Sequence, residues 1–142
     1  MRCLHAFSMA GLLAAICISP GRATELPLPS PPFLLPVSAD GIQRAIVTLD
    51  SYSYSPSHLV VEAGKPVELT LTSVTLITPH NLIIDDPAAG FSVEQEVGAR
   101  KTVTIMFTPS QLGLFPIYCD KRLWPMPSHR DNGMEGKLEV KQ

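Results

Sequence analysis

The feature that most restricts the fold of this chain is a succession of short β-type segments with no sustained helical periodicity. From Gly41 onward, apolar and β-branched runs alternate with turn residues at intervals of roughly 8–12 positions. Residues 67–72 alternate apolar and polar side chains, as a half-buried strand does, and Gly64 and Pro66 mark the turn before them. The pattern predicts an all-β fold, a Greek-key β-sandwich of about seven or eight strands.

Two of the expected strands, residues 91–97 and 101–107, are separated by a short connection that contains Gly98 and Ala99. We expect a β-hairpin here, because short connections that contain glycine are typical of hairpins. The other expected strands are residues 46–49, 58–61, 67–72, 80–84, 114–119 and 137–140.

The first 23 residues are predicted to be a secretory signal peptide. A basic start at Arg2 precedes an apolar stretch at 6–18, and small or helix-breaking residues follow at 19–23. The apolar stretch is too short to span a bilayer comfortably as a permanent helix. We therefore expect cleavage near Ala23 and a periplasmic protein with no integral membrane span after cleavage.

Residues 24–40 contain five prolines, a density that cannot enter the interior of a sheet and that favours an extended, polyproline-like conformation. We expect this segment to be an arm or linker, whose end docks on the fold through Leu34, Leu35 and Val37. Residues 41–142 are then expected to form one domain.

The charge and the cysteine content of the chain limit the classes of function that it can have. The formal net charge is −2, and removal of Arg2 and Arg22 with the signal peptide leaves 11 − 2 = 9 basic against 13 acidic residues. No run of basic residues indicates nucleic-acid binding.

Cleavage also removes Cys3 and Cys17, so the mature protein keeps Cys119 alone and cannot form an internal disulfide. A lone thiol in an oxidising compartment is open to oxidation unless it is buried or occupied.

The C-terminal third places Cys119 at the end of a predicted strand, His129 ten residues later, and Met134 in a Gly-Met-x-Gly-x-Leu-x-Val ending. Upstream, His80 begins another predicted strand and is followed by Asn81. In this order, and over roughly residues 46–140, the sequence resembles the cupredoxin family of blue copper domains. The resemblance implies one copper ion with His80, Cys119, His129 and Met134 as ligands, and a role for Asn81 in tying the two ligand segments together near the sulfur.

The residue types suit that chemistry independently of the resemblance. Thiolate favours Cu(I), imidazole suits both oxidation states, and a thioether makes a weak axial contact, so a His₂Cys site with a distant Met matches a copper that cycles between Cu(I) and Cu(II). Taken singly, a buried histidine, cysteine or methionine is more often structural. The joint order of the four residues favours a metal site. The remaining mature histidine, His58, has no place in the pattern and is expected to be structural or on the surface.

The segment between Cys119 and His129 is longer than in plastocyanin-like domains, with nine residues at 120–128. It carries Met126, a second thioether that is a weaker candidate than Met134 for the axial role. Trp124 is expected either to dock a partner or to pack within the loop. The nearby basic residues, Lys121, Arg122 and Arg130, either favour an acidic partner or belong to an ordinary solvated loop.

Two functions agree with the sequence. The first is a one-electron carrier, not an enzyme, which meets periplasmic redox proteins transiently and is expected to be a monomer. The alternative is a periplasmic protein that stores copper or delivers it to metalloenzymes. A metal-free structural sandwich leaves the lone Cys119 unexplained. No phosphate-binding loop, G-x-S-x-G elbow or C-x-x-C pair indicates another chemistry.

Overall fold

The computed structural model describes residues 30–142, so the predicted signal peptide and the first part of the proline-rich arm lie outside the described residues. Within this range the chain forms ten strands, one short 3₁₀ turn, η1 (Pro87–Ala89), and no α-helix. The strands are β1 (Phe33–Leu34), β2 (Gln43–Asp50), β3 (Ser53–Ser55), β4 (His58–Glu62), β5 (Val67–Ser73), β6 (His80–Asp86), β7 (Phe91–Val97), β8 (Thr102–Phe107), β9 (Gly113–Tyr118) and β10 (Glu135–Lys141).

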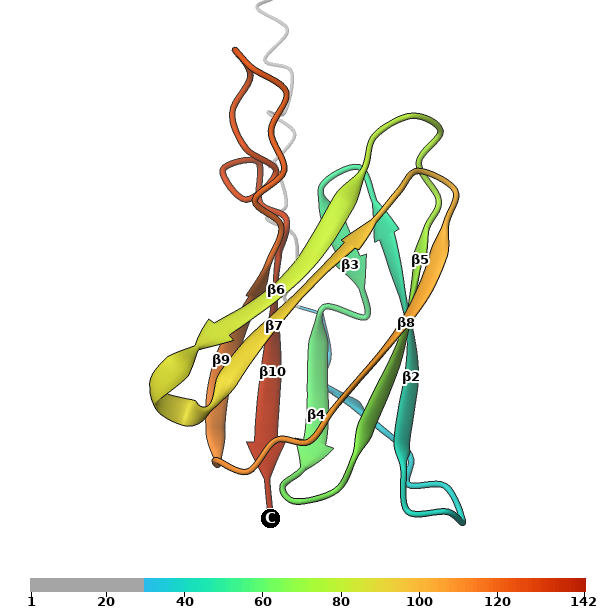
Figure 1. The fold of residues 1–142 in the computed structure, drawn as a ribbon, viewed down its shortest axis with the longest axis vertical. Helices are drawn as coiled ribbons and strands as arrows, with labels where there is room; N and C mark the ends of the chain where they lie inside the picture. The colour runs from blue at the N-terminus through green and yellow to red at the C-terminus, as the bar shows by residue number, and fades with distance from the viewer. Residues whose placement is uncertain (1–29) are drawn as a thin grey trace, which may run out of the picture.

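The strands form two sheets that pack face to face, which confirms the predicted all-β sandwich (Figure 1). One sheet has six strands in the order β1-β4-β10-β9-β6-β7, and the other has four in the order β3-β2-β5-β8. Strands β1 and β3 are only two and three residues long, and the other eight strands account for the number expected from the sequence. No helix among residues 30–142 is long and apolar enough to cross a membrane.

Alternation of apolar and polar residues builds the core between the sheets. In β5 the side chains of Val67, Leu69 and Leu71 are fully buried, while their polar neighbours are partly exposed. The facing six-stranded sheet contributes Leu82 and Leu138, among others, to the same cluster. Each such side chain contributes about 1.5–3 kcal/mol when it leaves water, so the core holds the frame on which loops at either end depend.

The expected hairpin at 91–107 is wrong. Strand β7 pairs with β6 in the six-stranded sheet, whereas β8 pairs with β5 in the four-stranded sheet. The connection carries the chain from one sheet to the other through a turn in which the Lys101 amide donates to the Gly98 carbonyl at 3.0 Å. Both arrangements need a short glycine-containing turn, so the local sequence does not distinguish them.

The end of the proline-rich arm lies against the sandwich. Strand β1 pairs in parallel with β4, the Leu35 amide donates to the Val60 carbonyl at 2.9 Å, and the Leu35 side chain is buried. Leu35 therefore docks on the fold as expected, whereas the side chains of Leu34 and Val37 stay exposed, so the expectation is wrong for these two. The division into an arm ending at residue 40 and a domain starting at 41 stays a prediction.

Three segments meet at one end of the sandwich. Strand β6 starts there, β9 ends there, and the connection from 119 to 134 leads from β9 into its antiparallel neighbour β10. This connection extends beyond the ends of the strands (Figure 1). It closes where the Cys119 amide donates to the Met134 carbonyl at 3.2 Å. The sandwich thus carries the predicted site residues on neighbouring strands and on one loop.

Candidate metal centre

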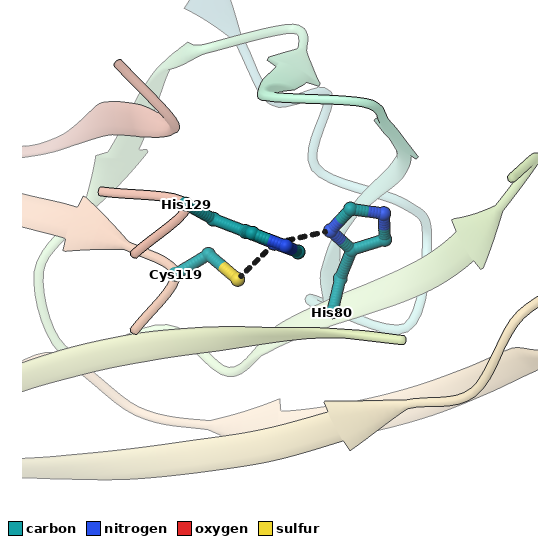
Figure 2. Close-up of side chains that lie close together, drawn as sticks. All are labelled: His80, Cys119 and His129. Atoms are coloured by element: carbon teal, nitrogen blue, oxygen red, sulfur yellow. Dashed lines mark hydrogen bonds between the residues drawn. The ribbon is translucent and has the colours of Figure 1, made fainter. Parts of the chain in front are cut away.

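Three of the predicted ligands converge at this end of the fold. His80 is the first residue of β6, Cys119 directly follows β9, and His129 lies in the connection to β10. The His129 Nδ1 atom lies 3.4 Å from Cys119 Sγ and 3.2 Å from His80 Nδ1 (Figure 2). One donor atom from each of the three side chains fits within 4.8 Å of the others, and all three residues are buried.

Hydrogen bonds within the protein do not satisfy all ring nitrogens of this cluster. The Nδ1 atom of His129 faces both the sulfur and the Nδ1 atom of His80, although an imidazole nitrogen either carries one proton or accepts one hydrogen bond along its lone pair. The other ring nitrogen of His80, Nε2, is buried without a hydrogen-bond partner among residues 30–142. A metal cation bound by the three donors would use their lone pairs together, so the arrangement fits a metal centre. One sulfur and two imidazole donors suit copper.

Burial sets the protonation of the donors. Burial, with a smaller contribution from the neighbouring His129, lowers the pKa of His80 to about 4. Burial also lowers the pKa of His129 and raises the pKa of the Cys119 thiol. Without metal, both imidazoles are therefore neutral near pH 7, which is the form that binds a metal, and the thiol loses its proton only when a metal replaces it.

The backbone holds Met134 beside both loop ligands. Its amide donates to the His129 carbonyl at 2.9 Å, its carbonyl accepts from the Cys119 amide at 3.2 Å, and its side chain is fully buried. The competing thioether, Met126, is half exposed near the tip of the loop. Burial beside the ligands favours Met134, and its axial role stays a prediction.

Asn81 connects β6 to the segment that follows β9. Its backbone amide points at Cys119 Sγ at 3.4 Å. Its side-chain amide donates to Asp120 Oδ1 at 2.8 Å, and its side-chain oxygen accepts from the Asp120 backbone amide at 3.1 Å. Asp120 was missed by the sequence analysis, although its position directly after Cys119 was a signal that it lies close to the site.

Two tyrosines near the site were also missed. The hydroxyl of Tyr54, in β3 of the opposite sheet, donates to the Asn81 carbonyl at 2.6 Å in the core. The ring of Tyr52 meets the His129 ring edge to face, with 5.4 Å between their centroids. Each contact joins residues far apart in the chain, so no local motif indicated either of them.

The base of the long loop is held by several contacts. The His129 amide donates to the Lys121 carbonyl at 2.8 Å, and the Arg130 guanidinium lies over the Tyr118 ring at 4.1 Å while it bonds Glu135 at 2.7 Å. These contacts fix the segment that carries His129 onto β9 and β10.

The tip of the loop is exposed and apolar. Leu123 and Trp124 keep 73% and 83% of their surface accessible, so the alternative that Trp124 packs within the loop is wrong.

Among the nearby basic residues, Lys121 pairs with Glu96 at 2.7 Å and Arg130 with Glu135, which offsets much of the positive charge expected around the tip. His58 is not part of the cluster of donor atoms, and it bonds Glu139 at 3.0 Å.

Comparison with known proteins agrees with this architecture. The model of the family described as Cupredoxin-like domain matches residues 11–139. No curated protein sequence matches the chain.

Several solved structures share the fold. The metal-binding domain of the Cu(I)-exporting P-type ATPase CopA of Streptococcus pneumoniae, solved with Cu(I), is 19% identical, with a TM-score of 0.59 over 80% of this chain and 98% of that domain. Dithionite-reduced auracyanin of Roseiflexus castenholzii is 17% identical, with a TM-score of 0.57 over 70% of this chain and 97% of its own. The copper-containing nitrite reductase of Thermus scotoductus is 15% identical, with a TM-score of 0.52 over 78% of this chain and 28% of the enzyme. At these identities the likeness concerns the fold.

Proposed function

The chain belongs to the cupredoxin-like domain family, and from this premise we propose that it is an exported one-electron carrier that binds one copper ion. In this proposal His80, Cys119 and His129 are the principal ligands and Met134 is a weak axial ligand. The observation that carries the proposal is the buried cluster of one sulfur and two imidazole donors within 4.8 Å of one another.

When bound, copper would supply a centre that gains and loses one electron between Cu(II) and Cu(I). The residues of the chain would hold that centre in one arrangement. His80 stands at the start of a strand paired on both sides, and Cys119 and His129 are tied by backbone hydrogen bonds to Met134 and Lys121. A frame that moves little between oxidation states favours fast exchange of single electrons.

The site suits an electron carrier better than an enzyme with a bound substrate. The three donors are buried, with His129 only 7% exposed, so the site offers little room for a substrate at the ligands. Exposed apolar side chains at the loop tip, among them Leu123 and Trp124, agree with transient docking of redox proteins. We propose a periplasmic monomer with transient redox partners, in accordance with the predicted signal peptide.

A second function, copper storage or delivery, is favoured by one observation. Met126 exposes half of its surface on the same loop that carries His129, and an accessible thioether can receive or pass on Cu(I). In that case the Met126 side chain would act as a transfer point, and the buried cluster as the storage site.

Reduction potential and copper transfer distinguish the two functions. An electron carrier is expected to show an intense thiolate-to-copper band and reversible one-electron cycling, with copper retained in both states. A delivery protein is expected to lose Cu(I) readily to a competing chelator, and Met126→Leu should slow that loss while the spectrum of the Cu(II) form stays unchanged. Retention of Cu(I) against the chelator would exclude delivery.

A further inference from the structure

Tyr54 makes a hydrogen bond that links the two sheets beside the metal centre. This residue belongs to β3, an edge strand of the four-stranded sheet that is only three residues long. Its side chain is 4% exposed, and its hydroxyl donates to the Asn81 carbonyl of the six-stranded sheet at 2.6 Å. A hydroxyl this deep in an apolar core needs a partner, and the partner here is the residue that follows a predicted ligand.

Asn81 is held at three points. Tyr54 fixes its carbonyl, Asp120 fixes its side-chain amide by two hydrogen bonds, and its own backbone amide faces Cys119 Sγ at 3.4 Å. Two of these contacts involve the segment that carries Cys119, and only the contact with Tyr54 comes from the other sheet. β7 and β9 hold β6 within its own sheet, and Tyr54 adds a hydrogen bond from the opposite sheet to the Asn81 carbonyl. This bond restrains the peptide group next to the Asn81 amide that approaches the sulfur.

We propose that Tyr54 is a positioning residue, whose hydroxyl sets the hydrogen bond from the Asn81 amide to Cys119 Sγ and thereby tunes the copper centre. The inference rests on the proposed copper site. An amide that donates to a thiolate withdraws electron density from the sulfur, and such bonds shift the reduction potential of sulfur-ligated metals. If the bond lengthens, the sulfur becomes a stronger donor and favours the oxidised metal.

The test compares Tyr54→Phe with Tyr52→Phe. The first substitution keeps the ring in the core and removes only the hydroxyl that bonds Asn81. The second removes a hydroxyl two residues away, from a tyrosine that is 40% exposed and that contacts His129 through its ring. Because both variants lose one oxygen from neighbouring tyrosines, Tyr52→Phe is a matched control.

The first readout needs no metal. In the metal-free protein, amide hydrogen exchange measured by NMR is expected to be about tenfold faster at Asn81 in Tyr54→Phe, the factor that corresponds to one ordinary hydrogen bond. The amide of Leu71, in the middle of β5, is expected to change much less. Equal acceleration at Asn81 and Leu71 would show a loss of overall stability only and would overturn the positioning role.

The second readout uses the copper-loaded protein. Tyr54→Phe is expected to lower the reduction potential and to move the thiolate-to-copper band to longer wavelength, while Tyr52→Phe, which keeps the ring that contacts His129, is expected to change both much less. The same band and potential in Tyr54→Phe and wild type would overturn the inference. If the wild-type protein binds no copper, the proposed function fails, and the exchange at Asn81 still decides whether Tyr54 positions this strand.

Discussion

Mild acid is expected to destabilise the metal-free protein through its buried ligand histidines. His80 is fully buried, and its pKa in the folded protein is lowered to about 4, against 6.5 for an exposed imidazole. Between these two values the unfolded chain binds a proton that the folded protein does not. The contribution of neutral His80 to the free energy of unfolding is therefore fully present above about pH 6.5 and is lost as the pH is lowered.

The size of the effect follows from the two pKa values. For His80 alone, the free energy of unfolding should fall by about 2 kcal/mol between pH 7 and pH 5, with a slope that approaches about 1.4 kcal/mol per pH unit. The lowered pKa of His129 acts in the same direction. Carboxylates with lowered pKa values, such as Asp40, lose their contribution only at lower pH, so this window isolates the histidines.

Urea unfolding of the metal-free protein at a series of pH values between 7 and 5 measures this loss. His80→Gln should remove much of the dependence of the free energy of unfolding on pH, whatever the effect of the substitution on stability at pH 7. His58→Gln is the control, because His58 on β4 does not belong to the cluster of donor atoms and its replacement should keep the loss attributed to His80. A wild-type stability that stays constant from pH 7 to pH 5 would refute the reasoning about buried, neutral imidazoles.

Two further substitutions test the axial position and the frame. Met134→Leu replaces a fully buried thioether by a side chain of similar volume, so it should cost less than about 1.5 kcal/mol in urea unfolding and should keep copper bound while the reduction potential rises. An unchanged potential would move the axial role to Met126. Gly136→Ala would bring a Cβ to 2.6 Å from the Ser57 carbonyl oxygen where β10 meets β4, and should cost about 1–3 kcal/mol in the same assay. Gly98→Ala is its control, since its Cβ would meet only Lys101 at an ordinary 3.4 Å, and equal costs for the two would contradict this reading of the packing.

Local pattern was sufficient to predict the sandwich. Successive side chains of a strand point to opposite faces, and the buried and exposed faces differ in composition. The alternation in β5 and the positions of most strands could therefore be predicted from the order of apolar and polar residues. The hairpin at 91–107 was wrong because pairing partners lie elsewhere in the chain. Strand β8 faces the core from the four-stranded sheet beside β5, and its turn signal does not specify that choice.

The residues of the candidate site were likewise only partly predictable from the sequence. The order of His80, Cys119 and His129 along the chain predicted which residues meet through its resemblance to the cupredoxin family, and copper chemistry agrees with these residue types. Tyr54 was not predictable, since its role depends on a hydroxyl that crosses from one sheet to the other over 27 positions in sequence. The exposure of Trp124 likewise depends on how the loop leaves the sandwich, which is held by tertiary contacts such as that of Arg130 with Tyr118 and Glu135 and not by a local motif.

The central claim is that Cys119 and two histidines bind one copper ion in a buried site. Titration of the purified, reduced protein with Cu(II), followed by visible absorption and metal analysis, tests it most directly with Cys119→Ser as the partner sample. We predict one copper per chain with an intense thiolate-to-copper band in the wild type, and a folded Cys119→Ser variant in which the band is absent. A wild-type protein that binds no copper, or a Cys119→Ser variant that keeps the band, would contradict the account.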